Sequence, residues 1–384
     1  LKETMKFSYH WTSIPFFDYL WMIFLASTTS AFIHHSRIPI SSILSLSSRR
    51  SLLSNNNLRL LTTSMSLLPP LIDVDCNLLH ADLKSIQSNN ENANVGDIIL
   101  EDAVKECNIR AMLSPASTLE ETKRSLKFIE KQNNDDTLQI LTTAGVHPYD
   151  VKDVDEIESQ YEELKALIQQ QQQQHVAAIG ECGLDASEGF PPLETQLPWF
   201  EAQVKLASEL NLPLFIHERL AFQQTMNILS NIQQPIIIHC FTGNREECQQ
   251  YIERGYFISV SGFILKPNVG DEVRACLEEG IIPLDKLMVE TDAPYMGFPD
   301  CRSAWLEKQS EYVSSLNSKK RKKLKSSQYP NVPSALPQVL DCVVKALNAG
   351  RSDRGMELLT TEEVAIATTQ NAIKFFGFNK DILS

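Results

Sequence analysis

The sequence predicts a closed (β/α)8 barrel of the TIM type, formed as a single domain by residues 71–380. From residue 71 onward, short apolar runs alternate with amphipathic stretches of helical period, which is typical of parallel strands joined by crossover helices. Eight such units over roughly 300 residues favour closure of the sheet into a barrel. An open doubly wound sheet is the alternative, but no glycine-rich phosphate loop follows the first apolar run.

Each predicted strand is a short run rich in Leu, Ile and Val, which can pack on both faces of a buried parallel sheet. The last of them, LMV at 287–289, stops at Glu290 and Asp292, and Pro294 cannot continue a ladder. We expect strands at 71–75, 109–114, 140–146, 176–181, 212–217, 235–240, 256–261 and 287–292.

The segments between these runs carry apolar residues at helical spacing. We expect helices at 97–107, 119–132, 153–170, 194–210, 219–229, 245–254, 271–279, 334–347 and 361–375. A glutamine tract at 169–174 indicates a segment of variable length without chemistry. The connection at 296–330 is long and strongly basic, and connections of this length are usually functional or disordered.

Composition narrows the classes of function. The chain has 384 residues and a formal net charge of −13, which argues against a surface that wraps nucleic acid as a whole. A local basic segment, such as Lys319–Lys325, is still compatible with phosphate binding. The eight cysteines form no CxxC pair, so neither a zinc ribbon nor a redox dithiol is indicated. A reducing compartment is the simplest interpretation for the folded domain.

Residues 1–70 have the composition of a targeting leader. No acidic residue occurs between Asp18 and Asp73, while arginine, serine and leucine are frequent, and an apolar stretch at 16–31 ends in small residues. This pattern is typical of a signal followed by a transit peptide, which predicts import into a plastid or mitochondrion. The alternative is a start at Met65, which predicts a cytoplasmic or nuclear protein. After residue 71 no apolar span is long enough for a transmembrane helix, so no stable membrane association of the mature domain is expected.

Acids and histidines stand at the ends of several predicted strands. Because neighbouring strands of a barrel lie about 5 Å apart, residues at equal height on different strands can converge on one ion. Carboxylates and neutral imidazoles are the donors needed for metal-assisted hydrolysis with an open position for water. The four residues in such positions are Glu181, His217, His239 and Asp292.

Several segments, in this order along the chain, resemble the signature segments of the TatD family of metal-dependent deoxyribonucleases. They are AGVHP at 144–148, GECGLD at 180–185, HER at 217–219, HCFTG at 239–243 and ETDAP at 290–294. The resemblance covers residues 71–378. It implies a TIM barrel of the amidohydrolase type that hydrolyses DNA phosphodiesters, commonly as a 3′→5′ exonuclease on single strands or 3′ ends, with DNA catabolism as its role.

The resemblance also implies roles for single residues. Glu181, His217, His239 and Asp292 would be metal ligands, with Glu181 as the bridge and Asp292 as the group that orients or deprotonates water. The family's first-strand Asp-x-His-x-His is replaced here by Asp73-Val74-Asp75-Cys76-Asn77, and Asp75 is expected to ligate through oxygen. One or two divalent ions are therefore expected, and an oxygen ligand suits Mg²⁺ or Mn²⁺ better than Zn²⁺.

Three further residues are expected to contact substrate. His147 follows the third strand and is interpreted as a ligand or a substrate contact, the alternative being a residue that caps the strand end. Arg219 stands two residues after a predicted ligand and can bind a phosphate in a bidentate way, the alternative being an ion pair with a barrel acid. Lys266 follows the seventh strand. Cys182 and Cys240 flank predicted ligands and are expected on the opposite face, between barrel and helices.

Two other functions stay open at this point. The same metal chemistry would serve a barrel hydrolase acting on an amide, ester or cyclic substrate. A non-catalytic adaptor that retains the barrel is the second alternative, since the first-strand histidines are missing.

Overall fold

The computed structural model describes residues 68–85, 97–132, 137–170, 174–308 and 310–383. The predicted leader therefore lies outside the described residues, apart from residues 68–70. Part of the glutamine tract, at 171–173, lies outside them as well. In the described part of the chain, no helix combines the length and the apolar character that crossing a membrane requires.

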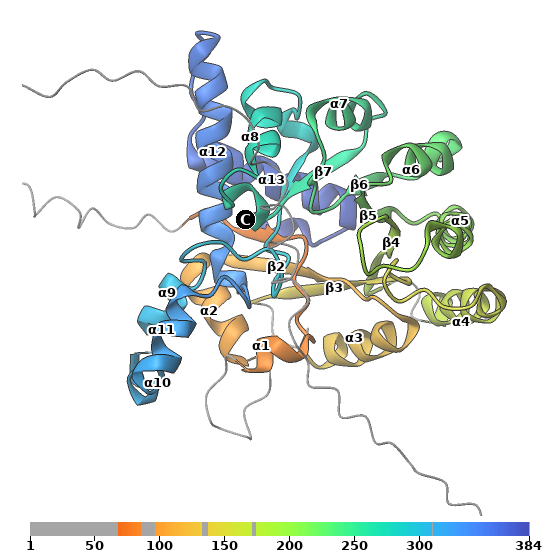
Figure 1. Cartoon of the computed structure of the whole chain (residues 1–384), viewed down its shortest axis with the longest axis horizontal. Coiled ribbons are helices and arrows are strands. Elements are labelled where there is room, and N and C mark those ends of the chain that lie inside the picture. Colours follow the sequence, from red (N-terminus) through yellow and green to blue (C-terminus); the bar gives the residue numbers. More distant parts are fainter. Residues whose placement is uncertain (1–67, 86–96, 133–136, 171–173, 309, 384) are drawn as a thin grey trace, which may run out of the picture. The chain divides into compact units, whose positions relative to one another are not determined.

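Eight strands form one parallel sheet in which each strand pairs with the next along the chain (Figure 1). The strand pairs run from Ile72 beside Ala111 to Val260 beside Val289, and the register shifts within the pairs β1–β2, β3–β4 and β4–β5. The strands are β1 (Leu71–Asp73), β2 (Ile109–Ser114), β3 (Gln139–Ala144), β4 (Val176–Asp185), β5 (Leu214–Arg219), β6 (Ile236–Ile238), β7 (Phe257–Val260) and β8 (Leu287–Val289).

The chain just beyond β1 and β8 closes the barrel. The Val74 amide donates to the Val289 carbonyl at 3.3 Å, and the Asp292 amide donates to the Asp75 carbonyl at 2.9 Å. Cys76 and Ala293 form a further parallel bridge. These bonds satisfy backbone groups that an open sheet would leave at its edges. The predicted TIM barrel is confirmed, and the open doubly wound alternative is wrong.

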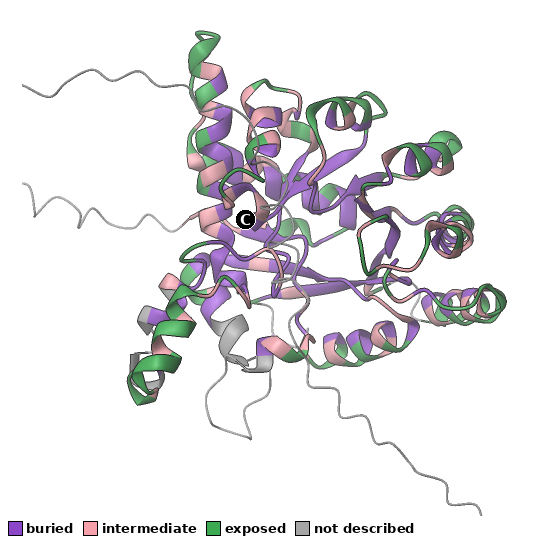
Figure 2. Cartoon of the chain, in the orientation of Figure 1, coloured by how far each residue is buried: buried purple, intermediate pink, exposed green. Residues whose placement is uncertain are grey.

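Helices connect successive strands and cover the outside of the barrel (Figure 1). Most of these helices have one buried and one exposed face, as the colouring of Figure 2 shows, and the buried positions are mainly apolar. The α-helices are α1 (Ala81–Ser85), α2 (Asp97–Cys107), α3 (Leu119–Gln132), α4 (Ile157–Gln170), α5 (Leu193–Leu210), α6 (Phe222–Ile228), α7 (Arg245–Glu253), α8 (Asp271–Glu278), α9 (Ser303–Lys308), α10 (Ser310–Ser315), α11 (Ser318–Ser326), α12 (Leu336–Asp353) and α13 (Thr361–Phe376). The 3₁₀ turns are η1 (Val154–Glu156), η2 (Leu229–Asn231), η3 (Gly262–Leu265), η4 (Leu284–Lys286), η5 (Pro333–Ala335) and η6 (Lys380–Leu383).

The structure corrects two element predictions. The helix expected from residue 219 begins instead at Phe222, because Arg219 continues β5 and pairs with Asp185 of β4. The basic connection at 296–330 is not an irregular loop, since it contains α9, α10 and α11. A capped helix forms there because Asn317 accepts a hydrogen bond from the Lys320 amide at 2.9 Å.

One end of the barrel is plugged by the last helix. Inward-facing side chains of the strands, including Phe215, pack with Phe375 and Phe376 of α13 in one buried cluster. The rings of Phe215 and Phe376 lie 6.1 Å apart, and the Asn371 side chain donates to the Leu287 carbonyl. The opposite end, where the strands finish, carries the polar residues.

Candidate metal centre

Two glycines of β4 determine how closely Glu181 on this strand approaches β5. Gly180 and Gly183 have φ values of 147° and 144°, a region that favours glycine. A Cβ on Gly180 would meet the Phe215 carbonyl oxygen at 2.3 Å, and a Cβ on Gly183 would meet the His217 carbonyl oxygen at 1.9 Å. The GECG segment thus lets β4 approach β5 closely, which brings Glu181 beside His217.

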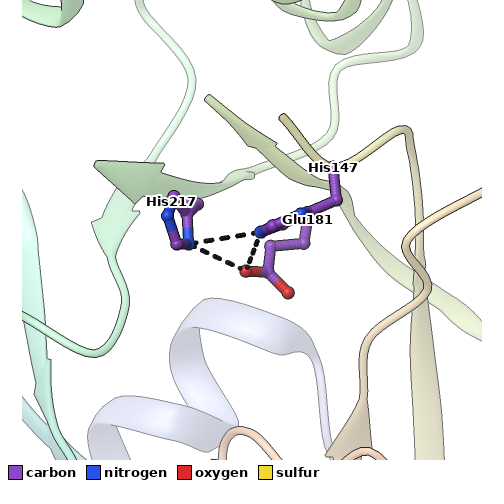
Figure 3. A group of neighbouring side chains, drawn as sticks. All are labelled: His147, Glu181 and His217. Carbon is purple, nitrogen blue, oxygen red and sulfur yellow. Dashed lines mark hydrogen bonds and ion pairs between the residues drawn. The ribbon is translucent and has the colours of Figure 1, made fainter. Parts of the chain in front are cut away.

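The first group of donors consists of His147, Glu181 and His217 (Figure 3). One carboxylate oxygen, Glu181 Oε1, lies 3.2 Å from His147 Nε2 and 3.2 Å from His217 Nδ1. The two ring nitrogens lie 3.4 Å from each other. His147 follows β3, while Glu181 and His217 lie within β4 and β5, so residues of three neighbouring strands converge here.

The second group consists of Asp75, His239 and Glu290, which lie at the ends of β1, β6 and β8. His239 Nδ1 is 3.1 Å from Asp75 Oδ2 and 3.7 Å from Glu290 Oε1. All three atoms are buried and none has a hydrogen-bond partner within the described chain. Buried polar atoms are normally satisfied, and three unsatisfied donors and acceptors that face one another suit a cation.

The two groups meet at one atom. His239 Nε2 lies 2.8 Å from Glu181 Oε1, the same oxygen that contacts His147 and His217. The arrangement therefore offers two neighbouring sets of nitrogen and oxygen donors with a carboxylate between them. This geometry suits the bridging role predicted for Glu181, and that role itself stays a prediction.

Neighbouring side chains orient the donors. His217 Nε2 lies 2.8 Å from Asp185 Oδ2, which turns Nδ1 toward Glu181. Ser259 donates to Glu290 Oε2 at 2.7 Å, and Asn77 donates to Asp75 Oδ1 at 3.3 Å. Such outer contacts fix the tautomer and direction of a ligand, as they do in known metal sites.

Burial and mutual charge displace the pKa values of these groups. Burial alone would raise the pKa of Glu181, but the charges of His239 and His147 hold it well below its usual range. Burial alone would lower the pKa of His239, but Glu181 and Asp75 raise it well above its usual range. For Asp75 burial prevails and raises the pKa, with a further rise from the Asp292 charge. These groups are thus strongly coupled through their charges, as expected where acids and imidazoles crowd around one point.

Asp292 lies close to both groups but is a member of neither. Burial, the largest cause, raises its pKa to about 7, and the charges of His239, Glu290 and Glu181 act on it as well. Cys240 was expected to face the layer between barrel and helices, and this expectation was wrong. Its thiol lies on the same side as Asp292 and is 3.2 Å from Ser261 Oγ. The residue has a φ of 44°, which breaks the alternation of side chains along the strand.

The remaining predicted residues lie around the centre. Lys266 directly follows η3, where burial lowers its pKa and the charges of Cys240 and Asp292 oppose that change. Arg219 is half-buried at the end of β5, near enough to Lys266 to affect its pKa. No carboxylate of the described chain pairs with Arg219, so the alternative ion pair with a barrel acid is not formed there. Substrate contacts by Arg219 and Lys266 stay predictions.

Sequence reasoning missed two residues. Glu290 opens the ETDAP segment, and its place directly after Val289 at a strand end was a usable signal. Asp185 closes the GECGLD segment, but its partner His217 stands on the next strand, so only the register of β4 against β5 reveals the pair.

Comparisons with known proteins agree with this geometry. The family model described as TatD related DNase matches residues 72–377. A "3'-5' ssDNA/RNA exonuclease TatD" of Shigella flexneri is 35% identical over 196 residues, which is 50% of this chain and 70% of the relative. The protein of the same description from Escherichia coli is 34% identical over 196 residues, with the same coverage of 50% and 70%.

The fold is also found among solved structures. A hydrolase TatD family protein from Entamoeba histolytica superposes with a TM-score of 0.61 at 24% sequence identity. The match covers 81% of this chain and 99% of that chain. At this level of identity the likeness concerns the fold.

Proposed function

Because the chain belongs to the TatD family of DNases, we propose that it is a metal-dependent nuclease that hydrolyses phosphodiester bonds of single-stranded nucleic acid from the 3′ end. The observation that carries this proposal is the junction of two donor groups, one partly and one fully buried, at Glu181 Oε1. The activity is a hydrolysis, and DNA is the substrate that the family description names. Polarity and preference for single strands rest on the names of the relatives.

We assign the ligand roles from the geometry. His147, Glu181 and His217 would hold one divalent cation, and Asp75, His239 and Glu290 would hold a second. The chemistry that such cations supply when bound is activation of water and neutralisation of charge on the phosphate. The mixture of three carboxylates with three imidazoles accepts Mg²⁺, Mn²⁺ or Zn²⁺ by donor type.

The chain's own residues supply the remaining functions. The Asp292 carboxylate, next to both groups, accepts a proton from the attacking water. Arg219 and Lys266 bring positive charge to the rim near Asp292, where they bind the phosphate of the substrate.

The test is cleavage of a 5′-labelled single-stranded oligonucleotide by the full chain with Mg²⁺, Mn²⁺ or Zn²⁺. We expect stepwise shortening from the 3′ end, loss of activity with a chelator, and a rate lower by about 100-fold or more in Asp292→Ala. His239→Ala should lose metal as well as activity. Full activity in either folded variant, with the fold checked by circular dichroism, would contradict these assignments.

The same experiment addresses the two alternatives left by the sequence. Turnover of amides or esters without cleavage of any oligonucleotide would favour the non-nucleic-acid hydrolase. Bound metal without turnover of any substrate would favour the adaptor.

We also propose, from sequence composition alone, that residues 1–70 direct import into a plastid or mitochondrion. A fluorescent protein fused behind residues 1–70 should enter the organelle, while a fusion beginning at Met65 should stay in the cytoplasm or nucleus. Equal distribution of the two fusions would refute a targeting role.

A further inference from the structure

Tyr149 is an aromatic residue that the metal centre does not use. Its side chain is 54% exposed, and among the aromatic residues whose burial the structure describes it alone is classed as exposed. Its hydroxyl has no hydrogen-bond partner within the described chain. A single exposed apolar side chain is common on protein surfaces, so the significance of Tyr149 depends on the rings that surround it.

The Tyr149 ring belongs to a small aromatic group at the edge of the donors. It meets the half-buried ring of Phe190 edge-on, with centroids 5.4 Å apart. Phe190 in turn lies nearly parallel to the ring of His217, at 6.2 Å and 22°, and contacts the ring of His147 at 6.1 Å. A continuous line of rings therefore leads from the first donor group to solvent.

The backbone holds both aromatic residues in place before any ligand arrives. The Tyr149 amide donates to His147 Nδ1 at 3.1 Å, and the Asp150 amide donates to the His147 carbonyl at 2.9 Å. The Phe190 amide donates to the Ser187 carbonyl, which closes a turn after β4. Rings positioned in this way lose little conformational entropy when a planar group binds.

We propose that Tyr149 and Phe190 form a stacking platform for an unpaired base of the nucleic-acid substrate, next to the phosphate that is hydrolysed. Proteins that bind single strands stack successive bases on aromatic side chains, and this contact tolerates any base because every base has a π-face. A base within a duplex already stacks on its neighbours, so the platform selects single-stranded ends. This inference rests on the proposed function and adds a base-binding site to it.

The test compares two single-stranded oligonucleotides that differ at their 3′ ends. One carries ordinary bases, and the other carries abasic residues at the last two positions with the same phosphates. For the full chain we expect kcat/KM on the base-bearing strand to be higher by roughly 5- to 150-fold per stacked base. Tyr149→Ala should lose most of this preference, while Tyr149→Phe and Tyr149→Trp should keep it, because a ring suffices for stacking.

Two controls make the result specific. Leu358→Ala removes an apolar side chain of similar exposure, 55%, on the connection between α12 and α13, and should leave the preference unchanged. Metal content of Tyr149→Ala should equal that of the unaltered chain, since Tyr149 is no member of either donor group. A preference that persists in Tyr149→Ala, or one that disappears in Tyr149→Phe, would overturn the platform.

Equilibrium binding separates failure of the platform from failure of the nuclease. If neither strand is cleaved, the nuclease assignment fails, but the affinities of the two strands, measured by fluorescence anisotropy, still decide the platform. Tighter binding of the base-bearing strand that depends on Tyr149 supports it. Equal binding refutes it.

Discussion

At the scale of single residues, the centre is organised around one carboxylate oxygen. Glu181 Oε1 faces three imidazole nitrogens, from His147, His217 and His239, at 2.8 to 3.2 Å. One oxygen cannot accept good hydrogen bonds from all three nitrogens. On the other side of His239, Glu290 Oε1 lies 3.7 Å from Nδ1 and has no hydrogen-bond partner in the described chain. These side chains therefore hold nitrogen and oxygen atoms that cannot all form hydrogen bonds with one another. Such unsatisfied atoms are expected in a set of metal ligands and are unusual in a structural network of ion pairs.

The residue that sequence reasoning missed provides the first prediction. Glu290→Gln keeps the hydrogen bond from Ser259 but removes the charge beside His239, so the full chain should retain about one fewer equivalent of metal and lose activity by about 10-fold or more. Elemental analysis of the purified protein measures the metal. Glu362→Gln, an exposed site on α13, is the matched control. Equal metal content in both variants would show that Glu290 is no ligand.

A second prediction concerns a residue that acts through its neighbour. Asp185 accepts from His217 Nε2 at 2.8 Å, so Asp185→Asn should let the imidazole rotate or change tautomer. Metal affinity should fall by about 10- to 100-fold while saturating metal restores much of the activity. A metal titration of turnover separates this positioning role from direct ligation. Asp353→Asn, on an exposed turn of α12, should titrate like the unaltered chain.

At the scale of elements, the apolar runs predicted all eight strands because period and composition depend on local sequence. The ends of strands were harder to predict. Arg219 continues β5 because Gly183 lets β4 extend alongside it, a contact between segments distant in sequence. Cys240 turns toward the centre through its positive φ, which alternation along a strand cannot reveal. Local pattern therefore predicted which residues approach the mouth, but not how each side chain is directed there.

The helix α11 shows how the basic segment is held. The buried guanidinium of Arg302 donates to the carbonyls of Leu324 and Ser327 at 2.6 and 2.7 Å, and Arg321 donates to the carbonyl of Val313 at 3.0 Å. The two arginines thus anchor α11 through backbone groups. Five lysines of this helix are left exposed, and none forms an ion pair with a described carboxylate: Lys319, Lys320, Lys322, Lys323 and Lys325.

The segment containing α11 begins after β8 and returns to the residues that directly follow this strand. Asn331 donates from its amide to the Pro294 carbonyl at 2.7 Å and from its side chain to the Thr291 carbonyl at 2.9 Å. Ser326, the last residue of α11, is five residues before Asn331 and so lies within about 18 Å of this anchor. The C-terminal end of α11 is thus tied to the chain that follows β8, and we expect its lysines to contact phosphates of a long strand whose end occupies the centre.

A third prediction follows for α11. Replacing its five exposed lysines by glutamine should lower kcat/KM on long single strands and flatten the dependence of log affinity on log salt by about 0.7 for each phosphate that the helix no longer neutralises. A trinucleotide, too short to reach the helix, should be cleaved as before. Lys374→Gln with Lys380→Gln, two exposed sites near the C-terminus, is the matched control. An unchanged salt dependence would assign the lysines to solubility alone.

At the scale of the whole molecule, the barrel divides its tasks between two ends. Phe215 packs below His239, with centroids 4.6 Å apart, and Phe376 of α13 packs below Phe215. The apolar cluster fills one end of the barrel, and the buried carboxylates lie at the other end. The sequence predicted the barrel and the approach of Glu181, His217 and His239, but Asp292 is a member of neither donor group and the apolar plug was not predicted. It did not predict the pairing of Asp75, His239 and Glu290, because their proximity depends on closure between β1 and β8.

This division predicts that the metal centre stabilises the molecule only when metal is present. Asp75 and Glu290 are fully buried beside Asp292, and burial of mutually repelling carboxylates destabilises the folded state. Asp75→Asn removes one of these buried acids with little change in volume. The metal-free variant should therefore melt at a higher temperature than the metal-free unaltered chain, although its activity is abolished. Tm is measured by calorimetry in the presence of a chelator.

With metal added, the order should reverse. A bound cation stabilises the folded chain by RT ln(1 + [metal]/Kd), which is about 2.7 kcal/mol at a hundredfold excess over Kd. Asp75→Asn binds metal more weakly, so it should gain little, while the unaltered chain gains the full amount and becomes the more stable of the two. Asp341→Asn, which removes an exposed carboxylate on α12, should follow the unaltered chain in both conditions. If the metal-free variant were the less stable one, Asp75 would be a structural residue whose contacts hold β1 to β8, rather than a donor kept at a cost to stability.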